Sequence, residues 1–443
     1  MTKKRIIISL FPLLSVFFLT QFALSEHVVN LLPNHLPVFI LTQPGTSSVA
    51  IDLWVKAGSR YDPPGKSGLA HFVEHLLFKG TTQRTSTAIS KEIAGLGGRM
   101  NAYTVWDYVQ VHISVLPQHL PRALEILADI VQDSLFAAEM VEKERKVILE
   151  EISLGNIYPP SYILNLITQT LFEGSQLGQP IAGTKETVME ITQAELLQFY
   201  KRHYLPNNSL LTVVGNIDPT KALAEIKEKL SSWPAGPVLP PPPAPSSKSK
   251  FPEVHKRRFL DQAIVVVALP ATSLTDQDRP AFEIINALLG SGAHSRLYQE
   301  IREKHALSYL VGSIYYPLAD TGIWATYAGT APENIQKVKS IFWRHLQKIQ
   351  EEPLSSAELS EIKNYLYGRT VMRLENNSAL ADFWGPQLLF GKFLSPQEFL
   401  AHIQKVNAHD VQRVAQKYFR EENLCLFILK PYPGLRFFHS LFR

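Results

Sequence analysis

The sequence is poor in cysteine, with Cys425 as the single example among 443 residues. One cysteine excludes an intramolecular disulfide framework and any zinc or redox site built from Cys-x-x-Cys pairs. Its neighbours, Leu-Cys-Leu-Phe-Ile-Leu (424–429), are apolar. Because unpaired cysteines are among the most buried residues, we predict a buried thiol in a strand.

Long hydrophobic runs are absent after residue 25, so no later segment offers the roughly 18 apolar residues of a membrane span. The first 25 residues have the three parts of a secretory signal peptide: basic Lys3, Lys4 and Arg5, an apolar stretch from Ile6 to about Phe22, and Ala-Leu-Ser (23–25). We expect cleavage after residue 25 and a periplasmic or secreted protein that does not contact the membrane. The alternative is an uncleaved N-terminal anchor.

An excess of charge of one sign is also absent. The formal net charge is +4, and the segment 1–25 supplies three of these charges without an acidic residue, so the remainder carries 4 − 3 = +1. No basic run or basic and aromatic patch is present, which argues against a nucleic-acid partner. With 45% hydrophobic and 19% charged residues, the composition is that of a folded globular protein.

Proline is concentrated in one place, the segment 232–250, which reads Ser-Trp-Pro-Ala-Gly-Pro-Val-Leu-Pro-Pro-Pro-Pro-Ala-Pro-Ser-Ser-Lys-Ser-Lys. Such a segment lacks backbone donors and is expected to be an extended linker. It divides the chain into two halves of similar length. The predicted organisation is a signal peptide (1–25), an N-terminal peptidase domain (26–231), the linker (232–250), a C-terminal domain of the same fold (251–430) and a tail (431–443).

Both halves mix strands with longer amphipathic helices. Apolar alternation predicts strands over 47–55, 108–115, 210–217, 263–269 and 423–429. Helical spacing predicts helices over 122–132, 138–154 (ended by Gly155), 219–230, 281–289, 295–304, 331–351 and 356–374. The predicted fold class is α+β, with two similar α/β halves that form a clamshell around a cleft.

The segment most informative about chemistry is His71-Phe-Val-Glu74-His75. On a helix that begins after Pro63-Pro64-Gly65 and ends near Gly80, the two histidines are at i and i+4 and face one ion. Glu74 is then beside the metal and suited to take a proton from water. This His-x-x-Glu-His order is the inverse of the common zinc-protease motif. The alternative is a pair of surface histidines.

A catalytic zinc needs a third protein ligand and an open position for water. The acidic helix 142–152 supplies candidates, since Glu144 and Glu151 are seven residues apart on one face, whereas Glu150 is rotated by about 100°. Taken alone, such a helix is also typical of a solvated acidic surface.

The segment 56–81, Lys-Ala-Gly-Ser-Arg-Tyr-Asp-Pro-Pro-Gly-Lys-Ser-Gly-Leu-Ala-His-Phe-Val-Glu-His-Leu-Leu-Phe-Lys-Gly-Thr, resembles the opening block of the pitrilysin and mitochondrial processing peptidase family, the inverzincins. The resemblance implies the two-half metallohydrolase fold of mitochondrial processing peptidase and one Zn²⁺ per chain. It assigns Glu151, 76 residues after His75, as the third ligand. Glu144 becomes the carboxylate that orients the site.

Two further blocks are similar to the same family. The segment 97–107 resembles the family's edge strand, which implies that Asn101 and Ala102 hold an extended peptide by strand addition; the alternative is a plain hairpin. The segment 295–309 resembles the block whose Arg and Tyr, here Arg302 and Tyr309, reach across the cleft to stabilise the oxyanion of the attacked carbonyl.

The sequence therefore predicts a zinc metalloendopeptidase that cuts unfolded or extended peptides with metal-activated water. The alternative is a catalytically silent scaffold or peptide-binding subunit of a two-chain complex, as some relatives are. Because this chain carries both the ligand set and the Arg-Tyr pair, a homodimer is expected, with a partner subunit of the same family as the other possibility. The aromatic tail 431–443 lies outside the resemblance.

Overall fold

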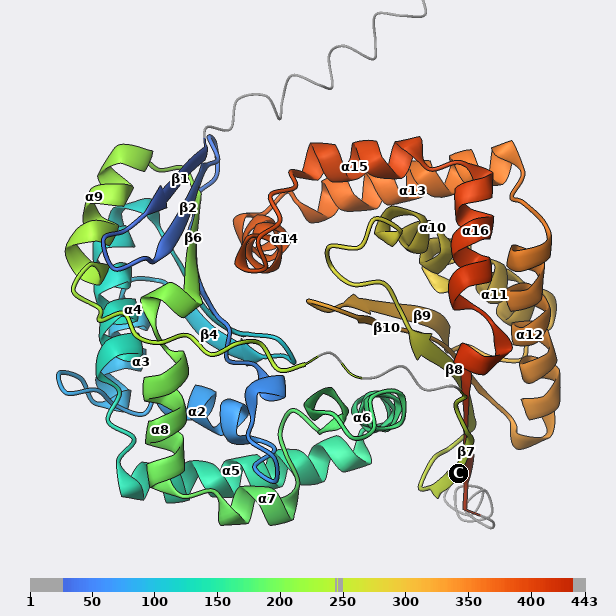
Figure 1. Cartoon of the computed structure of the whole chain (residues 1–443), viewed down its shortest axis with the longest axis horizontal. Coiled ribbons are helices and arrows are strands. Elements are labelled where there is room, and N and C mark those ends of the chain that lie inside the picture. Colours follow the sequence, from blue (N-terminus) through green and yellow to red (C-terminus); the bar gives the residue numbers. More distant parts are fainter. Residues whose placement is uncertain (1–26, 244, 246–249, 433–443) are drawn as a thin grey trace, which may run out of the picture.

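The computed structural model describes residues 27–243, 245 and 250–432. The predicted signal peptide and nearly all of the predicted tail lie outside these residues. None of the described helices is both long and apolar enough to cross a lipid bilayer. Two mixed sheets, each covered by helices, face one another as the two halves of a clamshell (Figure 1).

The elements of the first half lie between residues 27 and 230. The strands are β1 (His27–Leu31), β2 (Pro37–Thr42), β3 (Val49–Val55), β4 (Arg99–Thr104), β5 (Val109–Val115) and β6 (Ser209–Gly215). The helices are α2 (Leu69–Leu77), α3 (Ser86–Gly95), α4 (Leu120–Asp133), α5 (Ala138–Ile157), α6 (Pro159–Leu171), α7 (Lys185–Glu190), α8 (Gln193–His203) and α9 (Pro219–Leu230).

The elements of the second half lie between residues 253 and 431. The strands are β7 (Glu253–Arg258), β8 (Ala263–Pro270), β9 (Val311–Pro317), β10 (Gly322–Thr330) and β11 (Cys425–Pro431). The helices are α10 (Arg279–Gly290), α11 (Arg296–Tyr298), the π-helical turn η5 (Gln299–Lys304), α12 (Ile335–Glu351), α13 (Ser356–Arg373), α14 (Asn377–Leu389), α15 (Pro396–Lys405) and α16 (Ala408–Tyr418).

The strand order shows that the two halves have the same fold. The sheets run β1-β2-β6-β3-β5-β4 and β7-β11-β8-β10-β9, so that without β1 they correspond position by position. In each half the first pair of this common order is parallel (β2 with β6, β7 with β11), and the remaining pairs are antiparallel. The predicted fold class of two homologous halves is confirmed.

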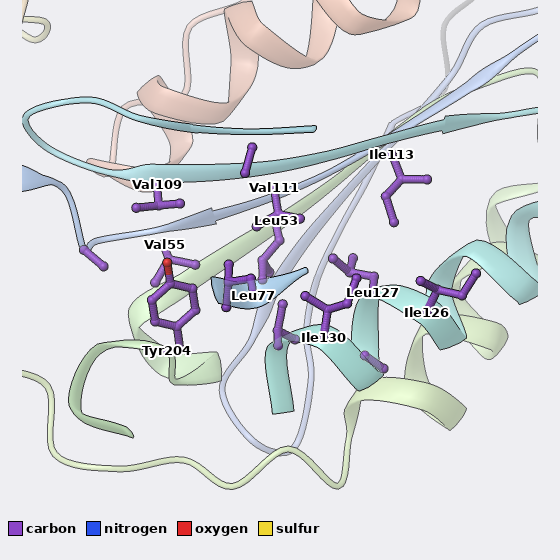
Figure 2. Packing of buried hydrophobic residues seen from close by; sticks show 14 of the residues in the cluster. Leu53, Val55, Leu77, Val109, Val111, Ile113, Ile126, Leu127, Ile130 and Tyr204 are labelled. Carbon is purple, nitrogen blue, oxygen red and sulfur yellow. The ribbon is translucent and has the colours of Figure 1, made fainter. Parts of the chain in front are cut away.

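The inner face of the first sheet packs against helices of its own half. Figure 2 shows Leu53 and Val55 from β3, with residues of β5, facing Leu77 of α2 and Ile130 of α4. Strand β3 is buried along its whole length, because its side chains alternate between two covered faces. This packing fixes α2, and with it the His-x-x-Glu-His segment, against the sheet.

The outer face of each sheet is covered by a helix of the other half. Helix α14 places Leu380, Ala381 and Trp384 on residues of β2, β3 and β6, including Phe39 and Ala50. Figure 1 shows α14 beside the first sheet although it follows α13 in the chain. Alternate residues of β3 thus belong to different cores, one within the half and one between the halves.

The second sheet shows the reciprocal arrangement. Helix α6 places Ile167 and Leu171 in one core cluster with outer-face residues of β8, β10 and β11, among them Val266 and Phe427. Cys425 belongs to this cluster and is fully buried, which confirms the predicted strand thiol. Each half therefore lends one helix to the other, which ties the halves together through two apolar contacts.

A third link between the halves is ionic. The buried guanidinium of Arg60 donates to Asp107 (Nη1–Oδ1, 2.6 Å) in the turn between β4 and β5, and to Asp320 (Nη2–Oδ2, 2.9 Å) in the turn between β9 and β10. It also donates to the carbonyl of Pro242 in the proline-rich linker (3.3 Å). The other carboxylate oxygen of Asp107 accepts a hydrogen bond from the backbone N–H of Ala319 (2.8 Å). Two turns and the linker thus meet at one arginine.

One predicted helix boundary is wrong. Helix α5 does not end at Gly155 but continues to Ile157, followed by Tyr158 as its C-cap with extended φ and ψ. A glycine in a helix interior costs only about 1 kcal/mol, whereas Pro159 forces the residue before it out of the helical region. The proline, rather than the glycine, ends the helix.

Candidate metal centre

Helix α2 is anchored at its start by a buried carboxylate. Asp62 accepts hydrogen bonds from the backbone N–H groups of Gly68 and Ala70, both at 2.8 Å. Gly68 has φ +95°, and a Cβ there would lie 2.7 Å from the carbonyl oxygen of Ala182, so only glycine fits. These contacts fix where α2 begins and hence the direction of the side chains that follow.

The three predicted ligands lie together. The rings of His71 and His75 have centroids 4.6 Å apart. The carboxylate of Glu151, on α5, lies close to both rings. Glu151 Oε2 is 3.7 Å from His71 Nε2 and 3.5 Å from His75 Nε2. One donor atom from each of the three residues lies within 4.8 Å of the others.

This spacing and chemistry fit zinc. The two distances from Oε2 exceed those of ordinary N–H···O hydrogen bonds, about 2.7–3.2 Å. Two ligand atoms held about 2.1 Å from a tetrahedral zinc are about 3.4 Å apart. Two imidazole nitrogens and one carboxylate are also a known catalytic zinc set that leaves a fourth position open.

Glu144 lies behind His75, where the resemblance placed an orienting carboxylate. His75 Nδ1 is 3.2 Å from Glu144 Oε2, and Lys79 Nζ is 2.8 Å from Glu144 Oε1. A proton on Nδ1 leaves the lone pair on Nε2, the nitrogen that faces Glu151. Sequence reasoning missed Lys79, although its place four residues after His75 was a signal for it.

Glu74 is half-buried beside the ligands and is held by β4. The hydroxyl of Thr104 donates to Glu74 Oε2 at 3.1 Å. Sequence reasoning missed Thr104 because the contact joins a helix and a strand 30 residues apart. No local signal in the sequence brings these two elements together.

The pKa values follow from burial and close charges. Burial and the neighbouring His75 together lower the pKa of His71 to about 4. Burial also lowers the pKa of His75, but the nearby carboxylates of Glu151 and Glu74 outweigh it, so that the net shift is upward. Contact with His75 lowers the pKa of Glu151, and burial raises the pKa of Glu74. Neutral His71 and anionic Glu151 are the forms that bind metals.

The second half lacks this set. Helix α10, the counterpart of α2 in the strand order, has the sequence Arg-Pro-Ala-Phe-Glu-Ile-Ile-Asn-Ala-Leu-Leu-Gly without a histidine or cysteine. Within the described part of the chain, one group of His, Cys, Asp and Glu side chains has the spacing of a metal site, and it is the one on α2 and α5. The fold is duplicated and the candidate site is not.

Asn101 and Ala102 lie on β4, which pairs only with β5 among the described strands and so forms a sheet edge. The backbone N–H of Ala102 donates to Asn101 Oδ1 at 2.9 Å, and Asn101 Nδ2 donates to the Tyr103 hydroxyl at 3.0 Å. The strand therefore has the edge position that strand addition needs. One backbone donor, the N–H of Ala102, is occupied by the side chain of Asn101.

Arg302 and Tyr309 lie near each other but apart from the ligands. The guanidinium of Arg302 lies 5.6 Å from the ring centroid of Tyr309 and 4.9 Å from that of Tyr298, and Tyr309 is 90% exposed. Arg302 belongs to η5, which directly follows α11, and Figure 1 shows α11 in the second half, well away from α2. This arrangement does not bring the predicted oxyanion pair to the metal centre.

One large cavity in the described part of the chain does not contain the metal ligands. It has a volume of about 1300 Å³ and lies between the segment that leads into α2, helix α8 and the proline-rich linker. Its walls include Arg60, Lys66, Phe199, His203 and Pro243. We therefore identify the site from the ligand geometry and not from the size of the cavity.

Family models match both halves. The model described as Insulinase (Peptidase family M16) matches residues 38–185, which include His71, Glu74, His75 and Glu151. The model described as Peptidase M16 inactive domain matches residues 190–366, which include α10. The half matched by the peptidase model carries the ligand set, and α10 in the part matched by the inactive-domain model has no histidine.

Full-length relatives carry related names. The chain is 34% identical over 394 residues to an "uncharacterized zinc protease" of Streptomyces coelicolor, an alignment that covers 87% of this chain and 85% of the relative. It is 32% identical over 395 residues to an "uncharacterized zinc protease" of Rickettsia bellii, with 88% and 94% covered.

Solved structures share the fold. A protease from Helicobacter pylori superposes with a TM-score of 0.85 at 24% identity, over 92% of this chain and 100% of that one. A protein from Pseudomonas fluorescens described as a peptidase M16 inactive domain gives a TM-score of 0.84 at 20% identity, over 92% and 98%. At these identities the likeness shows the fold alone.

Proposed function

The chain belongs to the M16 (insulinase, pitrilysin) family of zinc proteases, and from this we propose that it is a zinc-dependent endopeptidase acting on unfolded or extended peptides. The observation that carries the proposal is the convergence of His71, His75 and Glu151 beside a half-buried Glu74. A scaffold or silent subunit has no need for this set.

His71, His75 and Glu151 would hold one Zn²⁺ per chain, and Glu144 with Lys79 would fix the orientation of His75. Zinc bound there supplies two effects, a lowered pKa of water and a polarised substrate carbonyl. Glu74 accepts the proton of the attacking water and delivers a proton to the leaving amine nitrogen. Thr104 holds the Glu74 carboxylate in place for both transfers.

The edge strand β4 selects extended substrates. A peptide that pairs with β4 must present its own backbone donors and acceptors, which a folded protein does not. If a peptide pairs with the backbone N–H of Ala102, the hydrogen bond from this N–H to the Asn101 side chain must first break. Asn101 is then free to contact the bound peptide.

Arg302 and Tyr309 stabilise the oxyanion in this proposal, which requires them to approach α2. A closing movement of the two halves, or a second copy of the chain, would supply this approach. We also propose export by the N-terminal signal and a homodimer or a pair with a subunit of the same family.

The test compares the purified chain with Glu74→Gln. We expect about one zinc per chain in both proteins by elemental analysis. The unaltered chain cleaves a quenched fluorescent peptide library, and Glu74→Gln cleaves it about 10²–10⁴-fold more slowly because the general base is lost. Glu151→Gln serves as the matched control, with reduced zinc content as well as reduced cleavage.

Equal cleavage by the unaltered chain and Glu74→Gln would contradict the assignment of the base. If both proteins hold zinc and neither cleaves any peptide, the chain is a scaffold or a peptide-binding subunit, and the proposed function is wrong.

A further inference from the structure

Four large apolar side chains are exposed where α5 and α6 of the first half meet the end of β7 in the second half. Ile157 and Tyr158, at the junction of α5 and α6, are 73% and 61% exposed, and Phe259, which follows β7, is 80% exposed. Tyr432, which follows β11, is 41% exposed, and its ring centroid lies 4.9 Å from that of Phe259. We name these four residues the joint patch.

Arg258, the last residue of β7, connects the parts of the joint patch. Its guanidinium donates to the backbone carbonyl of Asn156 and lies 3.9 Å from the ring centroid of Tyr162 on α6. Its own carbonyl accepts a hydrogen bond from the backbone N–H of Tyr432 (3.1 Å). Figure 1 shows α6 next to β7 although the two belong to different halves. Both halves therefore contribute to the patch, which forms only when they are packed together.

Cations lie beside the joint patch. Lys256 and Arg257 of β7 and Lys430 of β11 are exposed, and Arg257 pairs with Lys430 in the strand register. Residues 253–261 and 430–443 together contain six Lys or Arg and two Asp or Glu, which gives 6 − 2 = +4. Because residues 26–443 carry +1 in total, the rest of that range carries 1 − 4 = −3. Positive charge is thus concentrated in the two segments that lead into the patch.

Two ordinary explanations account for only part of this surface. Charged side chains on an edge strand keep it from pairing with another sheet, and β7 pairs only with β11 among the described strands. Single exposed apolar residues are also common. Neither explains four large apolar side chains that come from both halves and lie beside cations, a combination that marks an interaction surface.

We propose that the joint patch binds the surface of a membrane that contains anionic lipids. The exposed Tyr, Phe and Ile side chains enter the boundary between headgroups and acyl chains, while Lys256, Arg257 and Lys430 contact lipid phosphates. Aromatic rings together with basic residues are typical of this kind of binding. The sequence 435–443, Leu-Arg-Phe-Phe-His-Ser-Leu-Phe-Arg, has the same mixture of apolar and basic residues without an acid.

This binding mode differs from the expectation that the exported chain does not contact the membrane. Ile157, Phe259 and Tyr432 are far apart in the sequence, so no window of it contains the patch. Binding at a membrane surface needs no helix that crosses the bilayer. It is also independent of the proposed peptidase activity.

The test mixes residues 26–443, the expected product of signal cleavage, with lipid vesicles and measures the bound fraction by flotation. Omitting residues 1–25 prevents the apolar stretch 6–22 from binding lipid itself. The chain should float with vesicles of phosphatidylcholine and phosphatidylglycerol in equal parts and should not float with phosphatidylcholine alone. Phe259→Ser and Ile157→Ser should each weaken binding about tenfold. Lys256→Glu combined with Arg257→Glu should weaken it roughly 30-fold.

Met372→Ser is the matched control, since Met372 is 66% exposed on α13, which Figure 1 shows at the opposite edge of the second half from β7. It should bind the anionic vesicles like the unaltered chain. Failure of the unaltered chain to float, or equal flotation with both kinds of vesicle, would overturn the proposal. If Phe259→Ser floats normally but sediments as a smaller species, the patch joins two copies of the chain, and the proposal is wrong.

Discussion

Thr104 contacts the proposed general base through its hydroxyl and its backbone. Its Oγ1 donates to Glu74 Oε2 at 3.1 Å from the edge strand β4. A hydrogen bond to a charged group contributes about 1.5–3 kcal/mol, so loss of the hydroxyl leaves the carboxylate held by Thr104 through the backbone hydrogen bond alone. We predict that Thr104→Val lowers kcat roughly tenfold at unchanged KM and zinc content, whereas Thr104→Ser retains activity. A lowered KM or a failure of serine to rescue would contradict this positioning role.

His203, at the end of α8, makes stability depend on pH. It is 4% exposed and packs on Phe199, and burial lowers its pKa to about 4, with a further contribution from Arg202. The unfolded value is about 6.5. The folded state therefore disfavours the proton, so that this contribution to stability is complete above pH 6.5 and is lost as the pH falls toward 4.

At pH 5 the loss is about 2 kcal/mol. We predict that the drop in melting temperature between pH 7.5 and pH 5 is smaller in His203→Gln than in the unaltered chain, because glutamine does not titrate. An identical drop in both proteins would show that His203 is accessible to protons in the folded state.

At this scale part of the site could be predicted from sequence. Helical spacing placed His71 and His75 toward one ion and Glu74 beside it, since the three are within five residues. Glu151 needed the resemblance as well, because its distance of 76 residues from His75 has no local meaning. The contacts of Thr104 and the separation of Arg302 from the ligands depend on how strands and halves are placed, which no spacing in the sequence expresses.

At the scale of elements, α14 fits against β3 through a glycine. A Cβ on Gly385 would lie 2.0 Å from Cε2 of the fully buried Trp54, whose Nε1 donates to Thr212. Nothing lies within 4 Å of a Cβ on Gly368 of α13. Both glycines are in helices of the second half. Gly385 is in contact with the first half, whereas nothing lies near Gly368.

We predict that Gly385→Ala destabilises the chain by roughly 1–3 kcal/mol through overpacking. The matched variant Gly368→Ala should be neutral or stabilising by up to about 1 kcal/mol, because alanine is the better helix former. Thermal unfolding of both variants decides the matter. Equal melting temperatures would mean that α14 moves away from Trp54 without cost.

Most helices and strands follow from periodicity, whereas their partners do not. The apolar residues of α14 are spread around the helix instead of forming one stripe, so the pattern predicts burial without indicating what covers it. The reciprocal packing of α6 and α14 therefore emerges only in three dimensions. The misplaced end of α5 at Gly155 is a different error, in which a weak local signal was preferred to the proline pair that follows.

At the scale of the whole molecule, the Arg60 network joins the halves at their turns. Asp107 is nearly buried and pairs with Arg60, whereas the side chain of Asp320 is 35% exposed. We predict that Asp320→Ala has a small effect on melting temperature, about 1 kcal/mol or less. Small-angle scattering should show a wider range of radii of gyration, because one link between the halves is removed.

Arg60→Met is the matched variant at the other end of the network. It leaves Asp107 buried without a cation and should cost about 3–5 kcal/mol. If Asp320→Ala and the unaltered chain scatter identically, the Arg60–Asp320 ion pair does not restrain the halves, and the other contacts between them are sufficient.

The exchange of helices also has a consequence for biosynthesis. The first sheet is complete once β6 ends at residue 215, but its outer cover α14 ends at residue 389, which is 389 − 215 = 174 residues later. At a synthesis rate of about 5–20 residues per second this interval lasts roughly 10 to 35 seconds. During it the nascent chain presents Phe39, Ala50 and Trp54 to its surroundings without their native partner. A holding chaperone that binds apolar strands has its target here, and a chain terminated before α14 would keep that target permanently.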